Sequence, residues 1–137
     1  MNNPISISTI IAAPITKTWT AFTTPTNIEK WNYASDDWHC PKAINDFQVG
    51  GKFCYTMAAK DGSFEFDFTG TFTEIIPEKF IAITLDDQRK MEVHFSEENG
   101  QTTVIEKFEA ENENPREMQE MGWQMILDNF KKHVELI

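Results

Sequence analysis

Glu106 is the residue whose type and position could do chemistry inside this protein. It lies in an apolar run with the same alternation as Val104 and Phe108, so a strand would point all three side chains to one face. A carboxyl group on an apolar face must find a partner or take up a proton, and it could orient a polar ligand group or act as an acid. Two ordinary alternatives stay open, because a bulge would return Glu106 to water and a nearby Lys or Arg could pair with it.

Tyr55 is the second candidate polar group, because a tyrosine ring can pack while its hydroxyl reaches into a cavity. Other carboxylates have a simpler expected position. Glu65 and Asp67 alternate with phenylalanines and belong to the outward, solvated face of a strand.

The soft side chains do not have the spacing of a metal site or a nucleophilic centre. The histidines and cysteines are His39, Cys40, Cys54, His94 and His133. None are paired at zinc-ligand spacing, and Cys40 beside His39 cannot form a catalytic pair by adjacency, because nucleophile and base must converge in space. Gly50-Gly51 lies between two expected strands, so it is a hairpin rather than a phosphate-binding loop. We therefore expect no metal, no cofactor and two free thiols.

The excess of acidic side chains restricts the classes of molecule that this protein can bind. The 137 residues carry 12 basic and 22 acidic side chains, for a net charge of −10. Such a chain would be repelled by nucleic acid and by anionic membranes. No apolar run approaches the roughly 20 residues that span a bilayer, and the N-terminus lacks the charged start of a signal peptide. We expect one domain over residues 1–137, located in the cytoplasm.

The elements that must position these residues are one strand, two short helices, six strands and a long helix. Ile5–Ile11 alternates like a half-buried strand, Pro14 and Pro25 each start a short helix, and residues 32–41 are expected to form a loop. Hairpin turns at Gly50-Gly51, Asp61-Gly62, Asp86-Asp87 and Asn99-Gly100 separate the later strands. Those strands are Ala43–Val49, Lys52–Ala59, Phe64–Ile76, Phe80–Leu85, Met91–Phe95 and Thr102–Ala110.

The final helix has a clear start signal and a broad apolar stripe. Asn114 can cap it, Pro115 suits the first turn, and Glu117 can reach back to the cap. Gly70, in the middle of the longest strand, suggests a bend or bulge there. Hairpin-linked strands with helices segregated in sequence predict an α+β fold with a curved antiparallel sheet covered by the long helix.

A sheet curled around a helix either fills its interior with side chains or leaves a pocket, and both outcomes stay open. We favour a pocket with a methionine-rich wall, because methionine adapts to ligands of irregular shape. The side chains expected to line it are Tyr55, Met57, Phe66, Phe68, Met91, Val93, Phe95, Val104, Glu106, Phe108, Met118, Met121 and Met125.

Five short motifs then resemble one family over almost the whole chain. They are Ala13-Pro14-x4-Trp19, Thr24-Pro25-x5-Trp31, Asp46-Phe47-x-Val49-Gly50-Gly51, Gly70-x-Phe72 leading to Ile76-Pro77, and Gly122-Trp123-x3-Leu127-x2-Phe130. In this order they resemble the heat-shock-protein-90 ATPase-activator homologue family. The resemblance implies the helix-grip fold of the START-like (SRPBCC) superfamily, whose cavity often holds an apolar small molecule.

The chain departs from that family in two respects. Its strand ends Ile83-Thr84-Leu85-Asp86, where relatives tend to carry an aromatic residue, often Trp. The eukaryotic co-chaperone of the family that this chain resembles has an additional N-terminal domain that contacts the middle segment of the chaperone, whereas one domain is expected here. The family supplies no shared catalytic motif.

Three functions follow as expectations, in this order. The first is binding of a small apolar or amphipathic ligand in the cavity, without chemistry of its own. The second, which rests on the resemblance, is contact with a chaperone ATPase. The third is a cyclase- or hydrolase-type enzyme that uses Glu106 or Tyr55.

Overall fold

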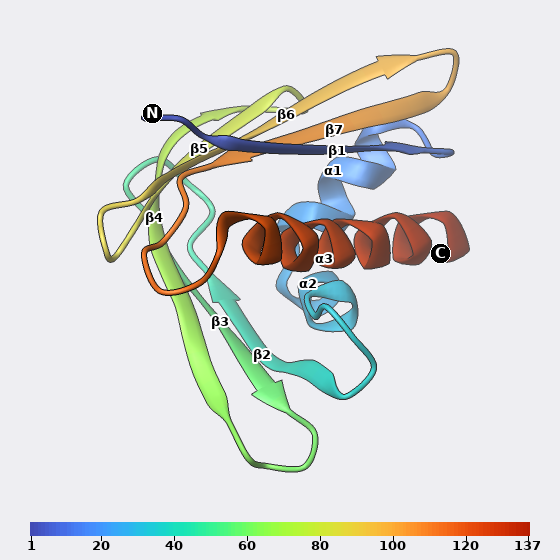
Figure 1. The fold of residues 1–137 in the computed structure, drawn as a ribbon. Coiled ribbons are helices and arrows are strands. Elements are labelled where there is room, and N and C mark those ends of the chain that lie inside the picture. Colours follow the sequence, from blue (N-terminus) through green and yellow to red (C-terminus); the bar gives the residue numbers. More distant parts are fainter.

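Seven antiparallel strands form one sheet that curls around the C-terminal helix (Figure 1). The computed structural model describes residues 1–137. In chain order the elements are β1 (Ile5–Ile11), α1 (Ile15–Thr23), α2 (Pro25–Trp31), β2 (Trp38–Asn45), β3 (Lys52–Ala59), β4 (Glu65–Ile76), β5 (Phe80–Leu85), β6 (Lys90–Glu98), β7 (Gln101–Phe108) and α3 (Arg116–Leu136). The predicted α+β arrangement, with two short helices after the first strand, is confirmed.

The strands follow a simple order in the sheet. It runs β1-β7-β6-β5-β4-β3-β2, so six consecutive strands form a meander and β1 returns beside β7. Within that last pair Ile5 lies opposite Phe108 and Ile11 opposite Thr102. The connection from β1 to β2 joins the two edges of the sheet, and α1 and α2 lie in it.

The tight turn between β6 and β7 has the predicted chemistry. Asn99 and Gly100 both have positive φ, +55° and +77°, which a two-residue type I′ hairpin requires. Glu98 and Gln101 are paired directly beside it. This turn sets the register of β7 and therefore the face to which Glu106 points.

The second strand begins earlier than its sequence predicts. β2 covers Trp38–Asn45, so the prediction of a strand at Ala43–Val49 and of a loop up to Pro41 is wrong in its boundaries. Pro41 cannot donate a ladder hydrogen bond, but β2 is an edge strand and its register shifts between His39 and Lys42. Edge strands and bulges are where a sheet tolerates proline.

Gly70 has a packing role rather than the predicted bulge. The register of β4 against β5 shifts between Phe72 and Glu74, beyond the glycine. A Cβ atom on Gly70 would lie 2.8 Å from Cε2 of Phe53 and 2.9 Å from the carbonyl oxygen of Thr84. The missing side chain lets the Phe53 ring lie against β4.

The start of α3 also differs from its sequence signal. Pro115 occupies the N-cap position, and no side chain caps the helix, so the predicted cap by Asn114 and Glu117 is wrong. The backbone N–H of Asn114 instead donates to Oε1 of Glu111 at 2.7 Å. The carboxylate that holds this turn therefore comes from the preceding loop.

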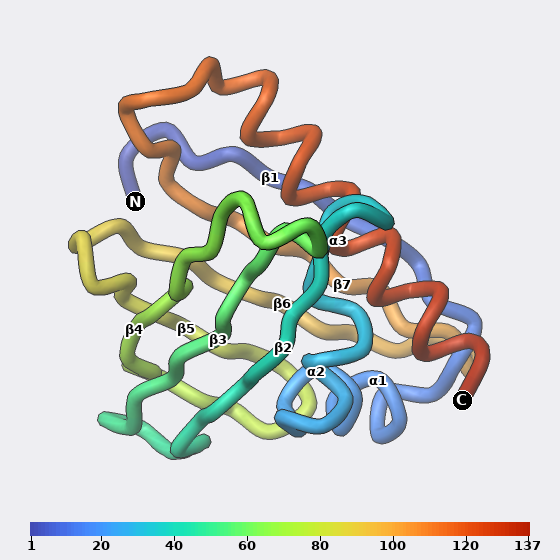
Figure 2. Tube along the Cα trace, turned by 90° about the horizontal axis from the view of Figure 1, so that it is seen from below, coloured from blue at the N-terminus to red at the C-terminus, as the bar shows by residue number.

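The three helices pack together on the concave side of the sheet. Figure 2 shows α1 and α2 beside the C-terminal half of α3. The indole N–H of Trp31 donates to the carbonyl oxygen of Ala21 at 2.9 Å, and its ring lies 4.8 Å from that of Phe130. None of these helices combines the length and apolar character needed to cross a membrane.

Candidate functional site

A cavity of about 500 Å³ lies between the sheet and the N-terminal half of α3. Of the 23 residues that line it, 15 are hydrophobic. Strands β3 to β7 form the concave wall, and Trp123 and Ile126 of α3 form the opposite wall. Phe22 of α1 and Trp31 of α2 also line it. This volume lies within the usual range for small-molecule sites.

Six of the residues predicted to line a pocket do so. They are Tyr55, Met57, Phe66, Phe68, Met91 and Glu106. Phe66 is 44% exposed, so the aromatic wall continues out to the solvent at the β3–β4 end of the sheet. The alternation of β3, β4 and β7 was sufficient to identify this inward face.

Four predicted residues lie in a solid part of the core instead. Val93, Phe95, Val104 and Phe108 are buried among other side chains and do not line the cavity. The Trp123 ring stacks on Phe108 with centroids 3.8 Å apart and an angle of 11° between their planes. Leu127, Phe130 and Val134 continue this packing along α3. The interior is therefore filled at one end and hollow at the other.

The prediction of a methionine-rich wall is wrong. Met118, Met121 and Met125 lie on an exposed face of α3, and Met121 is 66% exposed. Met118 lines a shallower depression with Trp38 and Phe66, and the other two methionines line neither hollow. Sequence reasoning treated the apolar positions of α3 as one stripe, but only the stripe through Trp123 and Phe130 faces inward.

Glu106 points into the cavity and has no protein partner. Its Cα lies opposite Ile7 on one side and Val93 on the other, and the residue is 8% exposed. Burial alone raises the pKa of its carboxyl group to about 8, with no contribution from a hydrogen bond or a charged neighbour. Both expected alternatives, return to water and pairing with Lys or Arg, are wrong. At neutral pH this carboxyl group is mainly protonated and can donate a hydrogen bond or a proton.

Tyr55 supplies a second polar group at the cavity wall. Its hydroxyl oxygen accepts a hydrogen bond from Nδ2 of Asn45 at 3.1 Å, and the same amide donates to the carbonyl oxygen of Thr23 at 2.9 Å. Burial raises the pKa of Tyr55 to about 12. The phenol therefore stays protonated at neutral pH and is a hydrogen-bond donor rather than a base.

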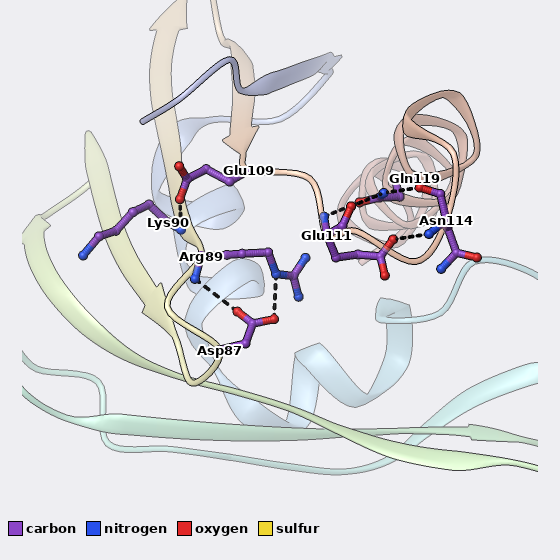
Figure 3. A network of polar contacts seen from close by, with 7 residues as sticks. All are labelled: Asp87, Arg89, Lys90, Glu109, Glu111, Asn114 and Gln119. Carbon is purple, nitrogen blue, oxygen red and sulfur yellow. Dashed lines mark hydrogen bonds and ion pairs between the residues drawn. The ribbon is translucent and has the colours of Figure 1, made fainter.

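Polar contacts hold two segments at one end of the cavity, the β5–β6 connection and the β7–α3 loop (Figure 3), and between them the backbone N–H of Lys90 donates to Oε1 of Glu109 at 2.6 Å. Nε of Arg89 donates to Oδ2 of Asp87 at 2.7 Å, which pairs this cation within its own hairpin. Gln119 accepts from the backbone N–H of Glu111 at 2.9 Å and donates to the carbonyl oxygen of Asn114 at 2.8 Å. These bonds hold the β7–α3 loop against the first turn of α3.

Sequence reasoning did not identify Arg89 or Gln119 as cavity residues. Gln119 is buried and lies four residues before Trp123, on the inward stripe of α3. That spacing was the available signal. Arg89 lies in the connection between β5 and β6, where no periodicity indicates which way a side chain points.

None of the histidines and cysteines lines the cavity. Burial raises the pKa of the Cys40 thiol to about 11, which makes it a poor nucleophile at neutral pH. His94 lies 3.1 Å from Glu92, and His133 lies 2.8 Å from Oδ1 of Asn27. No three His, Cys, Asp or Glu side chains are grouped so that they could hold a metal ion.

A family model described as Activator of Hsp90 ATPase homolog 1-like protein matches residues 12–135. No curated protein sequence matches the chain. Among solved structures, the AHSA1-like protein from Aeromonas hydrophila is 46% identical. Its TM-score is 0.88, and the match covers 96% of this chain and 93% of that one.

Two further solved structures are similar over nearly their full lengths. A protein from Cytophaga hutchinsonii is 41% identical with a TM-score of 0.84, and the match covers 98% of this chain and 94% of that one. A protein from Chromobacterium violaceum is 23% identical with a TM-score of 0.86, over 97% and 98% of the two chains. The last comparison shows a shared fold.

Proposed function

This protein belongs to the family described as Activator of Hsp90 ATPase homolog 1-like proteins, and on that premise we propose that it binds a small apolar or amphipathic molecule between its sheet and α3. The single observation that carries the proposal is the aromatic- and aliphatic-lined cavity of about 500 Å³. Protein interiors normally pack densely, and an unfilled cavity lowers the stability of the fold. A cavity of this size is therefore better explained by a ligand that fills it.

The composition of the wall supports the same function. Ligand sites are mainly apolar, with a few polar groups that fix the orientation of the ligand. Here Glu106 and the Tyr55 hydroxyl are the polar groups on the sheet side, and Trp123 provides a large apolar face on the helix side. An apolar molecule would leave water for this wall and gain about 25 cal/mol for each Å² of apolar surface that it buries.

Binding can be tested with 1-decanol, a neutral amphiphile, below the concentration at which it aggregates. We expect it to raise the melting temperature and to change the tryptophan fluorescence, since Trp31 and Trp123 line the cavity. A ligand that binds only the folded state at 100 times its Kd stabilises that state by about 2.7 kcal/mol. No change in melting temperature or fluorescence with decanol or with shorter and longer alcohols would contradict the proposal.

A pair of variants makes the test specific to the cavity. Ile83→Phe adds volume to a residue that lines the cavity and should weaken decanol binding about tenfold, which corresponds to about 1.4 kcal/mol. Ile10→Phe makes the same change on an exposed position of β1 and should leave the affinity unchanged. Equal effects of the two changes would place the alcohol elsewhere on the protein.

The family name supports a second candidate function, contact with a chaperone ATPase. The surface that favours it is the exposed apolar face of α3 at Met118, Met121 and Met125. Exposed methionines are common at protein-binding surfaces because the side chain adapts to different partners. Stimulation of a chaperone ATPase by the purified chain is the measurement that separates this function from ligand binding alone.

A further inference from the structure

We propose that the cavity selects amphiphiles whose polar end is a cationic ammonium group, and that Glu106 is the residue that receives this group. The proposal deepens the ligand-binding function proposed above and rests on it. It follows from three features of the site: an unpartnered buried carboxyl group, the lack of an unpaired cation in the wall, and the aromatic character of the remaining surface.

Glu106 is the one buried acidic or basic side chain, and the fold gives its carboxyl group no partner. Among the buried polar side chains that are engaged, Thr102 donates to the carbonyl oxygen of Ala13 at 2.8 Å, and Gln119 makes three hydrogen bonds with its own loop. Every fully enclosed side-chain nitrogen or oxygen has a hydrogen-bond partner. The oxygens of Glu106 therefore keep their accessible surface within the cavity, where a ligand group can reach them.

The charges around the cavity favour a cation over an anion. The one basic residue in its wall is Arg89, whose guanidinium group is already paired with Asp87 at 2.7 Å. Glu111 and Glu113 add two carboxylates to the wall, and the whole chain carries a net charge of −10. An anionic head group would meet these carboxylates without a free cation to offset them, whereas an ammonium group would be attracted.

The rest of the wall suits a cation that must leave water. Ten of the 23 lining residues are aromatic, and they include Phe53, Phe68 and Trp123. The ring centroids of Phe53 and Phe68 are 5.8 Å apart, as are those of Phe68 and Trp123, so these faces form a continuous surface. Aromatic faces attract ammonium groups electrostatically and offset part of the lost hydration. The same surface packs against the alkyl part of the ligand.

Ammonium binding should release a proton. The groups that line the cavity and titrate or carry charge are Tyr55, Arg89, Glu106, Glu111 and Glu113. Of these, Glu106 has its pKa raised to about 8, and Tyr55 has its pKa raised to about 12. At pH 7 the carboxyl group of Glu106 is mainly protonated, so pairing with an ammonium ion transfers its proton to the buffer.

The test compares three ligands with the same alkyl chain: decylamine, 1-decanol and decanoate. Calorimetry at pH 7, below the aggregation concentration of each, should give an affinity for decylamine at least tenfold higher than for decanol, with decanoate weakest. Titrations in buffers of different ionisation enthalpy should show release of close to one proton for each decylamine bound and of none for decanol.

Two variants assign the preference to one carboxyl group. Glu106→Gln should remove both the preference for decylamine and the proton release, while decanol binds within about twofold of its original affinity. Glu74→Gln makes the same substitution at an exposed position on β4 and should behave like the unchanged protein. A tenfold preference that survives in Glu106→Gln, or is lost in Glu74→Gln, would overturn the assignment.

The outcomes also separate this inference from the function on which it rests. Decanol binding without a preference for the amine, or tighter binding of decanoate, would refute the ammonium selectivity and leave the apolar site standing. Binding of none of the three ligands would refute both proposals. If Glu106→Gln failed to fold, the unchanged protein would provide the same test. Decylamine binding should release close to one proton at pH 7 and almost none at pH 9, where the carboxyl group of Glu106 is already ionised.

Discussion

Glu106 illustrates at the scale of one residue how a binding group can lower the stability of its own fold. Its carboxyl group is surrounded by apolar side chains and has no donor to replace the water that it loses on folding. The cost depends on pH, because the protonated form is much less penalised than the charged form. A ligand that supplies the missing partner would remove part of this cost, which links binding to stability.

We predict that Glu106 makes the protein less stable as the pH rises from about 4.5 to about 8. Over this interval the unfolded state has lost the proton while the folded state keeps it, because burial raises the pKa from 4.5 to about 8. The free energy of unfolding should therefore fall by up to about 1.4 kcal/mol for each pH unit and then level off above pH 8.

The measurement is denaturant unfolding of the unchanged protein and of Glu106→Gln between pH 4 and pH 9. The other titrating groups, such as Glu109 and Glu135 with lowered pKa values, are common to both proteins and cancel in the difference. The variant should gain relative stability with rising pH up to about pH 8. Parallel pH curves would show that the carboxyl group is not buried in solution.

At the scale of elements, α3 carries two apolar stripes with different environments. The stripe through Trp123, Leu127, Phe130 and Val134 packs inward, while Met118, Met121 and Met125 lie roughly on the opposite side of the helix and face out. Neighbouring positions on a helix differ by about 100° in direction, so a broad apolar stripe does not by itself say which part faces the sheet. The large aromatic and branched side chains occupy the packed side.

Two glycines, one in a strand and one in this helix, should respond to alanine in opposite ways. At Gly70 the new methyl group would meet the Phe53 ring and a backbone oxygen within 3 Å, so we expect a loss of about 1–3 kcal/mol in the free energy of unfolding. At Gly122 in α3 nothing lies within 4 Å of the new atom, and alanine should add up to about 1 kcal/mol through helix propensity.

Chemical denaturation of Gly70→Ala and Gly122→Ala measures both effects. Because each change adds one methyl group, the difference between them reports the surroundings of the glycine. A stabilising Gly70→Ala would mean that the Phe53 ring does not lie over β4 in solution.

At the scale of the whole molecule, the interior is divided between support and binding. Strand β1 lies against α3, and buried residues of β1, β6 and β7 share one core with Leu127, Phe130 and Val134 of α3, whereas the cavity lies mainly between β3–β5 and the N-terminal half of α3. The filled end anchors the helix against the sheet. The hollow end can then remain open without loss of the fold.

This division predicts opposite effects for truncations at the two ends. Leu127→Ala, in a residue that is 1% exposed and outside the cavity, should cost about 2–5 kcal/mol of stability and leave decanol affinity unchanged. Phe66→Ala, in a partly exposed residue of the cavity wall, should cost less than about 1 kcal/mol and weaken decanol binding severalfold. Unfolding curves and calorimetry below the melting temperature measure the two properties separately, and the reverse pattern would contradict a division into filled and hollow ends.

The sequence by itself determined the order of the elements, the curled antiparallel sheet and the inward face of most strands. Alternation in β3, β4 and β7 placed Tyr55, Phe68 and Glu106 on that face, because the two-residue period of a strand leaves little choice. Asn99-Gly100 set the β6–β7 hairpin in the same local way.

Tertiary structure alone decided which inward residues touch empty space and which touch one another. Val104 and Glu106 share a strand and a face, yet Val104 lies in solid core and Glu106 lines the cavity. Phe108 follows on the same face and is covered by the Trp123 ring. Likewise, the outward direction of Met121 depends on how α3 is rotated against the sheet. Contacts between distant segments set these features, and local periodicity carries no information about them.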